Sequence, residues 1–284
     1  LRSAPRFHVT GSDRIQAFAE SWHGIKSGEC LPELEMHLVS GSPVHSGFGS
    51  GTQLAQAVAL AMETWTGSGP NDREQHVRRV AATLDRGNRS MIGSYGFAHG
   101  GLIVDATDHA GRSFPAERIE LPAKWRVVVA VPRQTDKKFG LQEQTAFANI
   151  EFDVANRSRR LEQLLADSLV PAAAAGDFQQ FTDTVFEYGK LSGEYYTKVQ
   201  GGIYNGPVIT AVVESLVRLG ARGVGQSSWG PAVFCWCENQ QMADELMSRL
   251  PAKVGDSNEL FSTPVRNQPA HIRHGIQSSE RPSR

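Results

Sequence analysis

The chain has 284 residues, which is enough to bury the core of one large or two modest domains. Its 29 Lys and Arg residues nearly balance 30 Asp and Glu residues, and a formal net charge of −1 provides no overall basic field for nucleic acid. No apolar run approaches the ~20 residues that span a bilayer. We therefore expect neither a nucleic acid nor a membrane as a partner.

Strands and helices alternate in the first part of the chain. In chain order, the predicted elements are a strand at Pro5–Val9, a helix at Arg14–Trp22, a strand at Leu34–Val39, a helix at Gln53–Trp65, a helix at His76–Leu84 and a strand at Leu102–Asp105. In the helix at Gln53–Trp65, Leu54, Val58 and Ala61 fall on one apolar stripe. The chain opens at Leu1 within strand-like sequence and without Met, and we expect further residues to precede it.

A domain junction is predicted at Pro115–Lys124, because Trp125–Val131 then opens a strongly strand-like run that Pro132 closes. The elements predicted after this strand are helices at Arg159–Leu169, Phe178–Leu191 and Val208–Leu219, a strand at Ala232–Trp236 and a helix at Gln240–Leu250. Their order predicts an α+β domain with an antiparallel sheet. We expect an N-terminal domain over residues 1–122, a C-terminal domain over residues 123–265 and a disordered polar tail over residues 266–284.

A glycine-rich loop, Ser46–Thr52, leads directly into the helix at Gln53–Trp65. Glycine lets the backbone approach a ligand closely, and the N-terminus of the following helix offers free N–H groups and a partial positive charge. The loop is therefore predicted to bind an anion, for which phosphate is the usual case. It has no P-loop Lys, so backbone N–H groups and the hydroxyls of Ser46, Ser50 and Thr52 would hold the ligand. A turn that only starts a helix is the alternative.

A second glycine-rich segment runs from Arg89 to Gly101. The guanidinium of Arg89 offers two parallel donors to a phosphate or a carboxylate. Tyr95, Phe97 and His99 alternate with glycines, and this pattern favours a floor for an aromatic or sugar ligand. A strained surface turn is the alternative.

The third glycine-rich segment, Gly223–Pro231, places three polar side chains, those of Gln226, Ser227 and Ser228, in a row. We interpret Trp229 as a core anchor rather than as a stacking platform. Cys235 and Cys237 lie two residues apart in a predicted strand, and we interpret them as buried core thiols because no second Cys/His pair has metal-site spacing. Three cysteines, with Cys30, are too few for a disulfide framework and favour a reducing, cytoplasmic setting.

The loop Pro43-x-x-x-Gly47-Phe48-Gly49-Ser50-Gly51 resembles the second motif of the GHMP small-molecule kinases, P-x-x-x-G-L-G-S-S, which wraps nucleotide phosphate. Phe48 replaces the usual Leu, and Gly51 replaces the second Ser. The segment Gly223–Gly230 stands where that superfamily has its third glycine motif. The resemblance implies an α+β, GHMP-kinase-like fold with a ribosomal-S5-like N-terminal domain and a ferredoxin-like C-terminal domain.

A closer resemblance is to a non-kinase branch of that superfamily, β-ribofuranosylaminobenzene 5′-phosphate synthase. Its sequences contain R-S-x-I-G-T-Y-G-F-E-H-G-G-F-I-V-D and G-Q-S-S-W-G-P, which Arg89–Asp105 and Gly225–Pro231 reproduce. The departures are Ser94 for Thr, Ala98 for Glu and Leu102 for Phe. The first motif of the family has no counterpart, in agreement with an N-terminally incomplete chain.

One position separates a synthase from a kinase. Kinases of the superfamily often carry S-G-x-D followed by Gly-Gly, and the Asp assists phosphoryl transfer. Laid on that pattern, this chain has Gly93 where the Asp would stand. The substitution argues against phosphorylation by ATP, although an ATP-dependent GHMP-type kinase remains the alternative and a catalytically inactive metabolite-binding protein is a third reading.

The resemblance implies a phosphoribosyl transfer in tetrahydromethanopterin biosynthesis. Phosphoribosyl pyrophosphate would condense with a 4-hydroxybenzoate- or 4-aminobenzoate-like acid, and pyrophosphate and CO2 would leave. Mg²⁺ is the expected cofactor, with ATP needed only by a kinase, and a homodimer is left open. The metal ligands are not visible in the sequence. The expected catalytic residues are Arg89, Ser90 and His99. The expected phosphate- and substrate-binding residues are Ser46, Gly47, Gly49, Ser50, Gly51, Thr52, Gly93, Tyr95, Gly96, Gly100, Gly225, Gln226, Ser227, Ser228 and Gly230.

Overall fold

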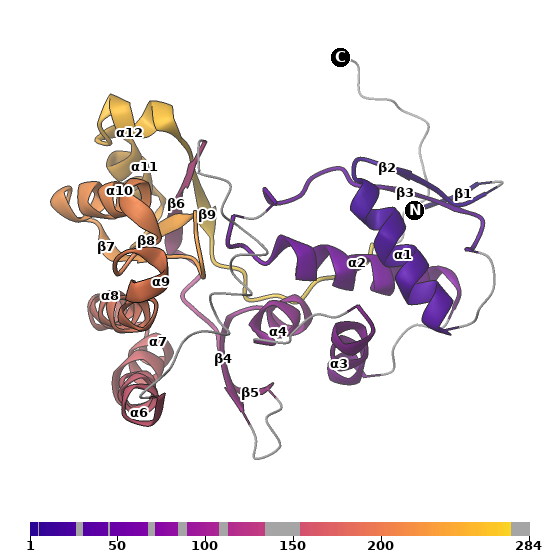
Figure 1. The fold of residues 1–284 in the computed structure, drawn as a ribbon, viewed down its shortest axis with the longest axis horizontal. Coiled ribbons are helices and arrows are strands. Elements are labelled where there is room, and N and C mark those ends of the chain that lie inside the picture. Colours follow the sequence, from indigo (N-terminus) through magenta and orange to yellow (C-terminus); the bar gives the residue numbers. More distant parts are fainter. Residues whose placement is uncertain are drawn as a thin grey trace.

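A computed structural model describes residues 1–4, 6–26, 31–44, 46–67, 72–84, 90–107, 113–133 and 154–273. The described chain has two lobes, one built before β6 (Arg126–Pro132) and one built from β6 onward. In Figure 1 the N-terminal lobe lies on the right and the C-terminal lobe on the left. Both lobes combine helices with strands, which confirms the expected α+β class.

The N-terminal lobe holds two small sheets and four helices among its described residues. In chain order these are β1 (Arg2–Ser3), β2 (His8–Thr10), α1 (Asp13–Lys26), β3 (Leu34–His37), α2 (Ser50–Trp65), α3 (Arg73–Thr83), α4 (Ile92–His99), β4 (Leu102–Thr107) and β5 (Ser113–Ile119). Strand β3 pairs with β1 antiparallel and with β2 parallel, while β4 and β5 form a separate antiparallel pair. The apolar stripe of α2 packs with α1 and β3 around Trp22, Leu34 and Val58.

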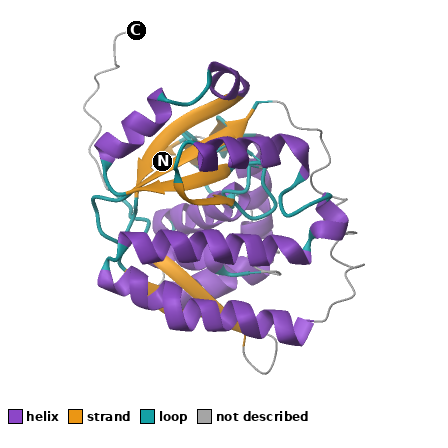
Figure 2. Ribbon diagram, turned by 90° about the vertical axis from the view of Figure 1, so that its left-hand side faces the viewer, coloured by secondary structure: helices purple, strands orange, loops and turns teal. Residues whose placement is uncertain are grey.

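The C-terminal lobe is built on an antiparallel sheet with the strand order β7-β8-β6-β9. After β6 its elements are α6 (Val154–Leu164), a π-helical turn (Leu165–Leu169), α7 (Val170–Ala175), α8 (Phe178–Tyr195), α9 (Thr197–Gln200), α10 (Gly206–Arg218), β7 (Arg222–Gln226), β8 (Val233–Cys237), α11 (Gln240–Ser248), α12 (Ala252–Ser257) and β9 (Asn258–Pro264). Helices lie in front of the sheet when this lobe faces the viewer (Figure 2).

The two faces of this sheet have different neighbours, because alternate residues of a strand point to opposite sides. Val128 and Cys235 belong to a cluster that α10 and α11 complete. Val129 and Val131, on the other face of β6, join Ala232 in a second cluster. The strand β6 is therefore buried on both faces, and its apolar run was visible in the sequence for that reason.

Three parts of the chain differ from the sequence-based expectation. The segment 92–99 forms a helix, α4, although no helix was predicted there. Residues 113–119, which overlap the expected junction, form β5 and pair with β4. Half of the third glycine-rich segment is β7, which pairs with β8. Glycine-rich strands and helices carry weak local signals, and tertiary pairing decides their structure.

The expected disordered tail also needs correction over residues 266–273, which cross back to the N-terminal lobe (Figure 1). The N–H of Gly101 donates to the carbonyl of Arg266 at 2.7 Å, and that of Ala270 donates to Phe97 at 2.8 Å. The amide of Asn267 donates to the carbonyl of Leu121 and accepts from its N–H. These backbone partners order the segment, and residues 274–284 lie outside the described part.

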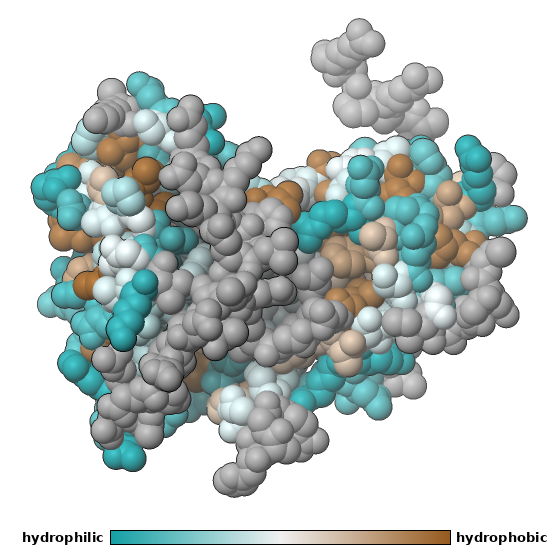
Figure 3. Space-filling view, in the orientation of Figure 1, coloured by the Kyte–Doolittle hydropathy of each residue, from teal (hydrophilic) through white to brown (hydrophobic). Residues whose placement is uncertain are grey.

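No helix among the described residues is both long and apolar enough to cross a membrane. Polar side chains cover the outer margins of both lobes in the space-filling view, with apolar patches between them (Figure 3).

Candidate active site

Two of the three glycine-rich segments meet where the lobes join. The first segment, residues 46–52, is called the first glycine loop below. The third segment, residues 223–231, is called the second glycine loop. The hydroxyl of Ser227 donates to the carbonyl of Gly47 at 3.0 Å, and the N–H of Ala232 donates to the carbonyl of Ser46 at 3.3 Å. Gly47 has a φ of +85°, and a Cβ added to it would lie 2.3 Å from the carbonyl oxygen of Ser227. Only glycine allows this approach.

Phe48 fixes the first glycine loop to the C-terminal lobe. Its half-buried side chain packs against the cluster of Val129, Val131 and Ala232. Its ring lies 6.3 Å from that of Phe261 on β9, centroid to centroid. The one large residue of the loop is therefore an inter-lobe anchor, and it sets the N-terminus of α2 beside the second glycine loop.

The N-terminus of α2 is arranged as an anion site. Gly49 is the N-cap, with a left-handed φ of +64°, and no side chain caps the helix. The N–H groups of Ser50, Gly51 and Thr52 thus begin a 16-residue helix without intrahelical partners. Nothing lies within 4 Å of a Cβ added to Gly49, so this side of the loop is open. Such a terminus attracts a phosphate.

Helix α4 packs its first turn against the first turn of α2. The Gln53 side chain donates to the carbonyl of Gly93 at 2.5 Å, and a Cβ on Gly93 would lie 3.4 Å from Thr52. One turn further, Gln56 donates to the hydroxyl of Ser94 at 3.2 Å. Gly93 therefore lies beside the first turn of α2, and its part in binding a substrate stays a prediction.

Ser90 stands just before α4 and holds a carboxylate that sequence reasoning missed. Its hydroxyl accepts from the N–H of Ile92 at 3.1 Å and donates to Oδ2 of Asp105 at 2.9 Å. The hydroxyl of Ser113 donates to the same oxygen at 2.9 Å. Asp105 is the last residue of the family-like run that begins at Arg89. Its place in that run was the one signal in the sequence that it could lie near the site.

Other predicted residues of α4 lie away from its first turn. Tyr95 is fully buried, its hydroxyl donates to the carbonyl of Ser113 at 3.1 Å, and burial raises its pKa. His99 ends the helix and stacks on Tyr95, with ring centroids 6.4 Å apart. Gly100 abuts the carbonyl of Gln268. Tyr95, His99 and Gly100 therefore do not face the glycine loops, because the helix turns them toward the core and the C-terminal segment. No neighbour approaches a Cβ on Gly96.

Side chains of the second glycine loop mainly hold the loop itself. Gln226 accepts from the N–H of Asn205 at 2.7 Å and donates to the carbonyl of Ser228 at 2.9 Å. Gly225 leaves space for the ring of Phe234, and the N–H of Gly230 donates to the carbonyl of Ser227. Ser228 is exposed and has a left-handed φ of +54°.

We expected Trp229 to be a core anchor, but its side chain is only half-buried. Its ring meets that of Tyr196 edge-on, with centroids 5.2 Å apart. The prediction for the cysteines is confirmed, because Cys235 and Cys237 are buried and burial raises the pKa of Cys237 to about 11.

Two expectations are not tested at the site: the role of Arg89 and the binding of Mg²⁺. Arg89 lies outside the described residues, so its role stays a prediction. Across the described ranges, no group of three or more His, Cys, Asp and Glu side chains could hold a metal ion.

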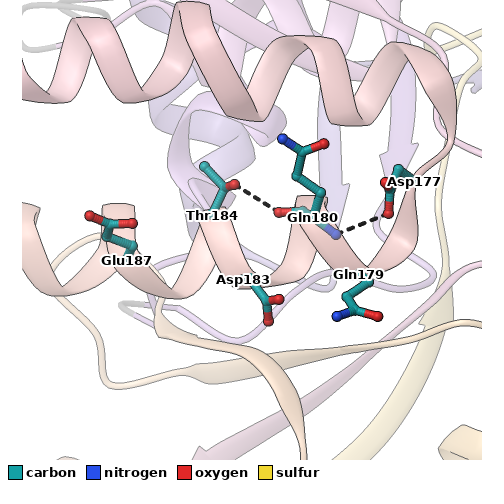
Figure 4. A pocket seen from close by; sticks show the side chains of 6 residues that line it. All are labelled: Asp177, Gln179, Gln180, Asp183, Thr184 and Glu187. Atoms are coloured by element: carbon teal, nitrogen blue, oxygen red, sulfur yellow. Dashed lines mark hydrogen bonds between the residues drawn. The ribbon is translucent and has the colours of Figure 1, made fainter.

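A shallow hollow on α8 is a separate feature (Figure 4). Its lining residues come from this helix and its N-cap: Asp177, Gln179, Gln180, Asp183, Thr184 and Glu187. Asp177 caps the helix, and Asp183 pairs with Arg222 at 2.9 Å. It includes no glycine-rich segment, so we place the candidate site at the lobe junction.

Known sequence families match both lobes. Residues 14–101 match the GHMP kinases N terminal domain, and residues 169–256 match the GHMP kinases C terminal domain. The two matches include the first glycine loop, the whole of α4 and the second glycine loop. The chain belongs to the GHMP kinase superfamily. The expected fold is thereby confirmed.

Three similar relatives of this GHMP superfamily chain carry the name beta-ribofuranosylphenol 5′-phosphate synthase, in agreement with the expected branch. That from Methanothermobacter thermautotrophicus is 30% identical over 207 residues, 68% of this chain and 60% of the relative. That from Archaeoglobus fulgidus is 29% identical over 221 residues, 72% of this chain and 65% of the relative. The Methanocaldococcus jannaschii relative is 23% identical over 90% of this chain and 78% of its own length. The chain thus spans less than two thirds of the first two relatives.

Solved GHMP structures share the fold at low sequence identity. A putative homoserine kinase from Listeria monocytogenes has a TM-score of 0.68 at 15% identity, covering 96% of this chain and 88% of that one. The L. major mevalonate kinase, solved with R-mevalonate, has a TM-score of 0.67 at 15% identity, covering 95% and 85%. These likenesses concern the arrangement of the elements alone.

Proposed function

We propose that this chain transfers the phosphoribosyl group of phosphoribosyl pyrophosphate to a 4-hydroxybenzoate- or 4-aminobenzoate-like acid, with loss of pyrophosphate and CO2. The reaction would serve tetrahydromethanopterin biosynthesis. The observation that carries the proposal is the contact of Gly47 with Ser227, which sets the open N-terminus of α2 at the lobe junction. The names of the three relatives support a synthase.

The described residues would act by binding and orienting. The N–H groups of Ser50, Gly51 and Thr52 would hold a phosphate of the donor at the N-terminus of α2. Loss of pyrophosphate leaves a cationic ribosyl carbon, so the reaction requires charge stabilisation and positioning more than a protein nucleophile. A site between two lobes also removes water from this reactive carbon.

The site is compatible with Mg²⁺, the ion that usually accompanies a pyrophosphate-containing substrate. Mg²⁺ keeps several waters and takes substrate phosphate oxygens with few protein ligands, so a cluster of three acidic side chains is not required. The hydroxyl oxygens of Ser50 and Thr52, which lie beside the open N–H groups, are of the kind that binds Mg²⁺. When bound, the ion would neutralise the charge of the departing pyrophosphate.

The experiment supplies the purified chain with phosphoribosyl pyrophosphate, Mg²⁺ and 4-hydroxybenzoate or 4-aminobenzoate, and follows pyrophosphate and CO2. A parallel reaction supplies ATP and small alcohols and follows ADP. We expect pyrophosphate and CO2 in equal amounts and no ADP. ADP that depends on an alcohol, without pyrophosphate release, would replace the synthase with a kinase.

A further inference from the structure

Helix α4, which packs against the N-terminus of α2, is a weak helix by its own sequence. It is only eight residues long, and it contains Gly93 and Gly96. Glycine is among the least favourable residues inside a helix, and a helix shorter than about 12 residues is marginal by itself in water. The helix therefore depends on its packing and on the groups that satisfy its two ends.

The last four carbonyls of α4 all have partners, although a helix leaves such carbonyls without partners in a further turn. These carbonyls belong to Gly96, Phe97, Ala98 and His99. The first accepts from the N–H of Gly100 at 3.0 Å, and the second accepts from the N–H of Ala270 at 2.8 Å. The third accepts from the side chain of Arg73 at 3.3 Å, and the fourth from that of Arg118 at 3.2 Å. Distant segments of the chain thus close this end of the helix.

The C-terminal strap, residues 266–273, supplies one of these partners and holds two others. Ala270, which caps Phe97, belongs to the strap. Arg73 also donates to the carbonyl of Ala270 at 3.2 Å, and Arg118 also donates to the carbonyl of Asn267 at 2.6 Å. Each guanidinium therefore bridges a helix carbonyl and a strap carbonyl, and its positive charge is favourable beside a helix C-terminus. The strap and the two arginines together form the C-terminal cap of α4.

The strap connects this cap to the C-terminal lobe. It leads from the end of β9 to α4 (Figure 1). The side chain of Asn267 donates to the carbonyl of Leu121 at 2.7 Å and accepts from its N–H at 3.1 Å, between β5 and β6. The strap backbone passes so close to α4 that a Cβ on Gly100 would lie 2.6 Å from the carbonyl oxygen of Gln268. The end of α4 is therefore held in a fixed place relative to both lobes.

The first turn of α4 carries this restraint to the candidate phosphate site. Gly93 accepts from the side chain of Gln53 at 2.5 Å and abuts Thr52, whose N–H is one of the open groups of α2. Ser94 accepts from the side chain of Gln56 at 3.2 Å. Because α4 has only about two turns, a shift at its capped end also moves its first turn.

We propose that the C-terminal strap positions α4, and that binding of the phosphorylated donor at the N-terminus of α2 depends on this cap. Arg73, Arg118 and Asn267 are positioning residues, because they act through α4 and the linker rather than by contact with the substrate. The strap, α4, α2, the two glycine loops and the C-terminal sheet form a closed ring of contacts. Loosening the strap therefore lets the N-terminus of α2 move relative to the second glycine loop. The inference rests on the proposed function only for the identity of the donor.

The test measures two quantities in the full chain. One is the hydrogen exchange of the α4 amides, and the other is the affinity for inorganic pyrophosphate, determined by calorimetry with Mg²⁺. Arg118→Ala removes the bridge between helix and strap, and Asn267→Ala removes both bonds to the linker. Exchange should accelerate by about tenfold in both turns of α4, as the loss of two hydrogen bonds implies. Pyrophosphate affinity should fall by about fivefold or more.

Two further variants separate positioning from general stability. Arg218→Ala on α10 is the matched control, since it loses an exposed pair with Glu214 and touches neither the strap nor α4. It should change neither quantity. Arg118→Lys keeps the charge but lacks the planar fork that reaches two carbonyls, so its losses should be intermediate, and it provides the same comparison if Arg118→Ala does not fold. Thermal unfolding shows that each variant is folded at the temperature of the titration.

The outcomes distinguish this inference from the proposed function. Faster exchange in both turns of α4 together with weaker pyrophosphate binding supports the strap as a positioning segment, even if the chain releases no CO2 from the expected substrates. Unchanged pyrophosphate affinity in the strap variants overturns it, even if the synthase reaction proceeds. Exchange that accelerates only in the last turn of α4, or not at all, also overturns it, as does a wild-type chain that does not bind pyrophosphate.

Discussion

Gly47 and Ser227, 180 residues apart in the chain, form the contact that joins the two glycine loops. The Ser227 hydroxyl donates to the Gly47 carbonyl, and the Ser227 carbonyl oxygen occupies the space that a side chain at position 47 would need. The two loops therefore cannot approach unless residue 47 is glycine. The geometry of the candidate site depends on this absence of a Cβ.

Gly47→Ala should destabilise the protein and separate the loops. The added Cβ would lie 2.3 Å from the Ser227 oxygen, and the φ of +85° is itself unfavourable for alanine. Gly49→Ala is the control, because its φ of +64° carries similar strain while nothing lies within 4 Å. Strain alone costs about 1–2 kcal/mol, and urea unfolding should show a larger loss for Gly47→Ala. Equal losses would contradict the steric argument.

Gly49→Val should abolish binding of the phosphorylated donor. The side chain would fill the open side of the loop before the first N–H groups of α2. Gly67→Val, just beyond the other end of the same helix, is the matched control, since its φ of +72° is similar and its surroundings are equally open. Calorimetric titration with phosphoribosyl pyrophosphate should show binding to the control variant alone. Undiminished affinity in Gly49→Val would show that the phosphate does not bind at this loop.

Arg79→Ala should cost more stability than Arg78→Ala on the same helix. Arg79 pairs with Glu63, whose side chain is 0% exposed and also contacts His76 at 2.7 Å. Arg78 pairs with Glu74 on the surface, where both side chains are over 40% exposed. Removing a partner of a buried carboxylate costs about 2 kcal/mol when that partner is half exposed, and losing a surface i,i+4 pair costs about 0.3–0.5 kcal/mol. Urea unfolding of both variants measures the difference, and equal losses would mean that Glu63 does not depend on Arg79.

Tyr95→Phe should change the response of stability to alkaline pH. Burial raises the pKa of Tyr95 in the folded state, so its contribution is complete below the unfolded pKa of about 10 and is lost as the pH rises through the folded pKa. At pH 7 the variant loses the hydrogen bond to Ser113, about 1 kcal/mol. The gap in unfolding free energy between wild type and variant should narrow from pH 9 toward pH 11. A constant gap would contradict burial as the cause of the shift.

Elements with strong local patterns were predictable from the sequence. The apolar run of β6 reflects burial on both faces of the sheet, and the apolar stripes of α2 and α10 reflect burial of one side of each helix. Both patterns can be read from residues that are neighbours in the sequence. The glycine loops were also recognisable, because glycines directly before or after a helix pattern are a local feature of the sequence. Their residue types predicted a phosphate site.

The tertiary structure decided which of those residues share one place. Helix α4 turns Tyr95 and His99 away from the loops, although both stand within the glycine-rich segment that the sequence singled out. Asp105 reaches the site because β4 returns beside Ser90 and pairs with the strand that carries Ser113. The sequence alone determined the elements with strong local patterns, such as α2 and β6, since these patterns depend on neighbours a few residues away. Pairing across the lobes depends on packing between distant segments, for which a single sequence has no local signal.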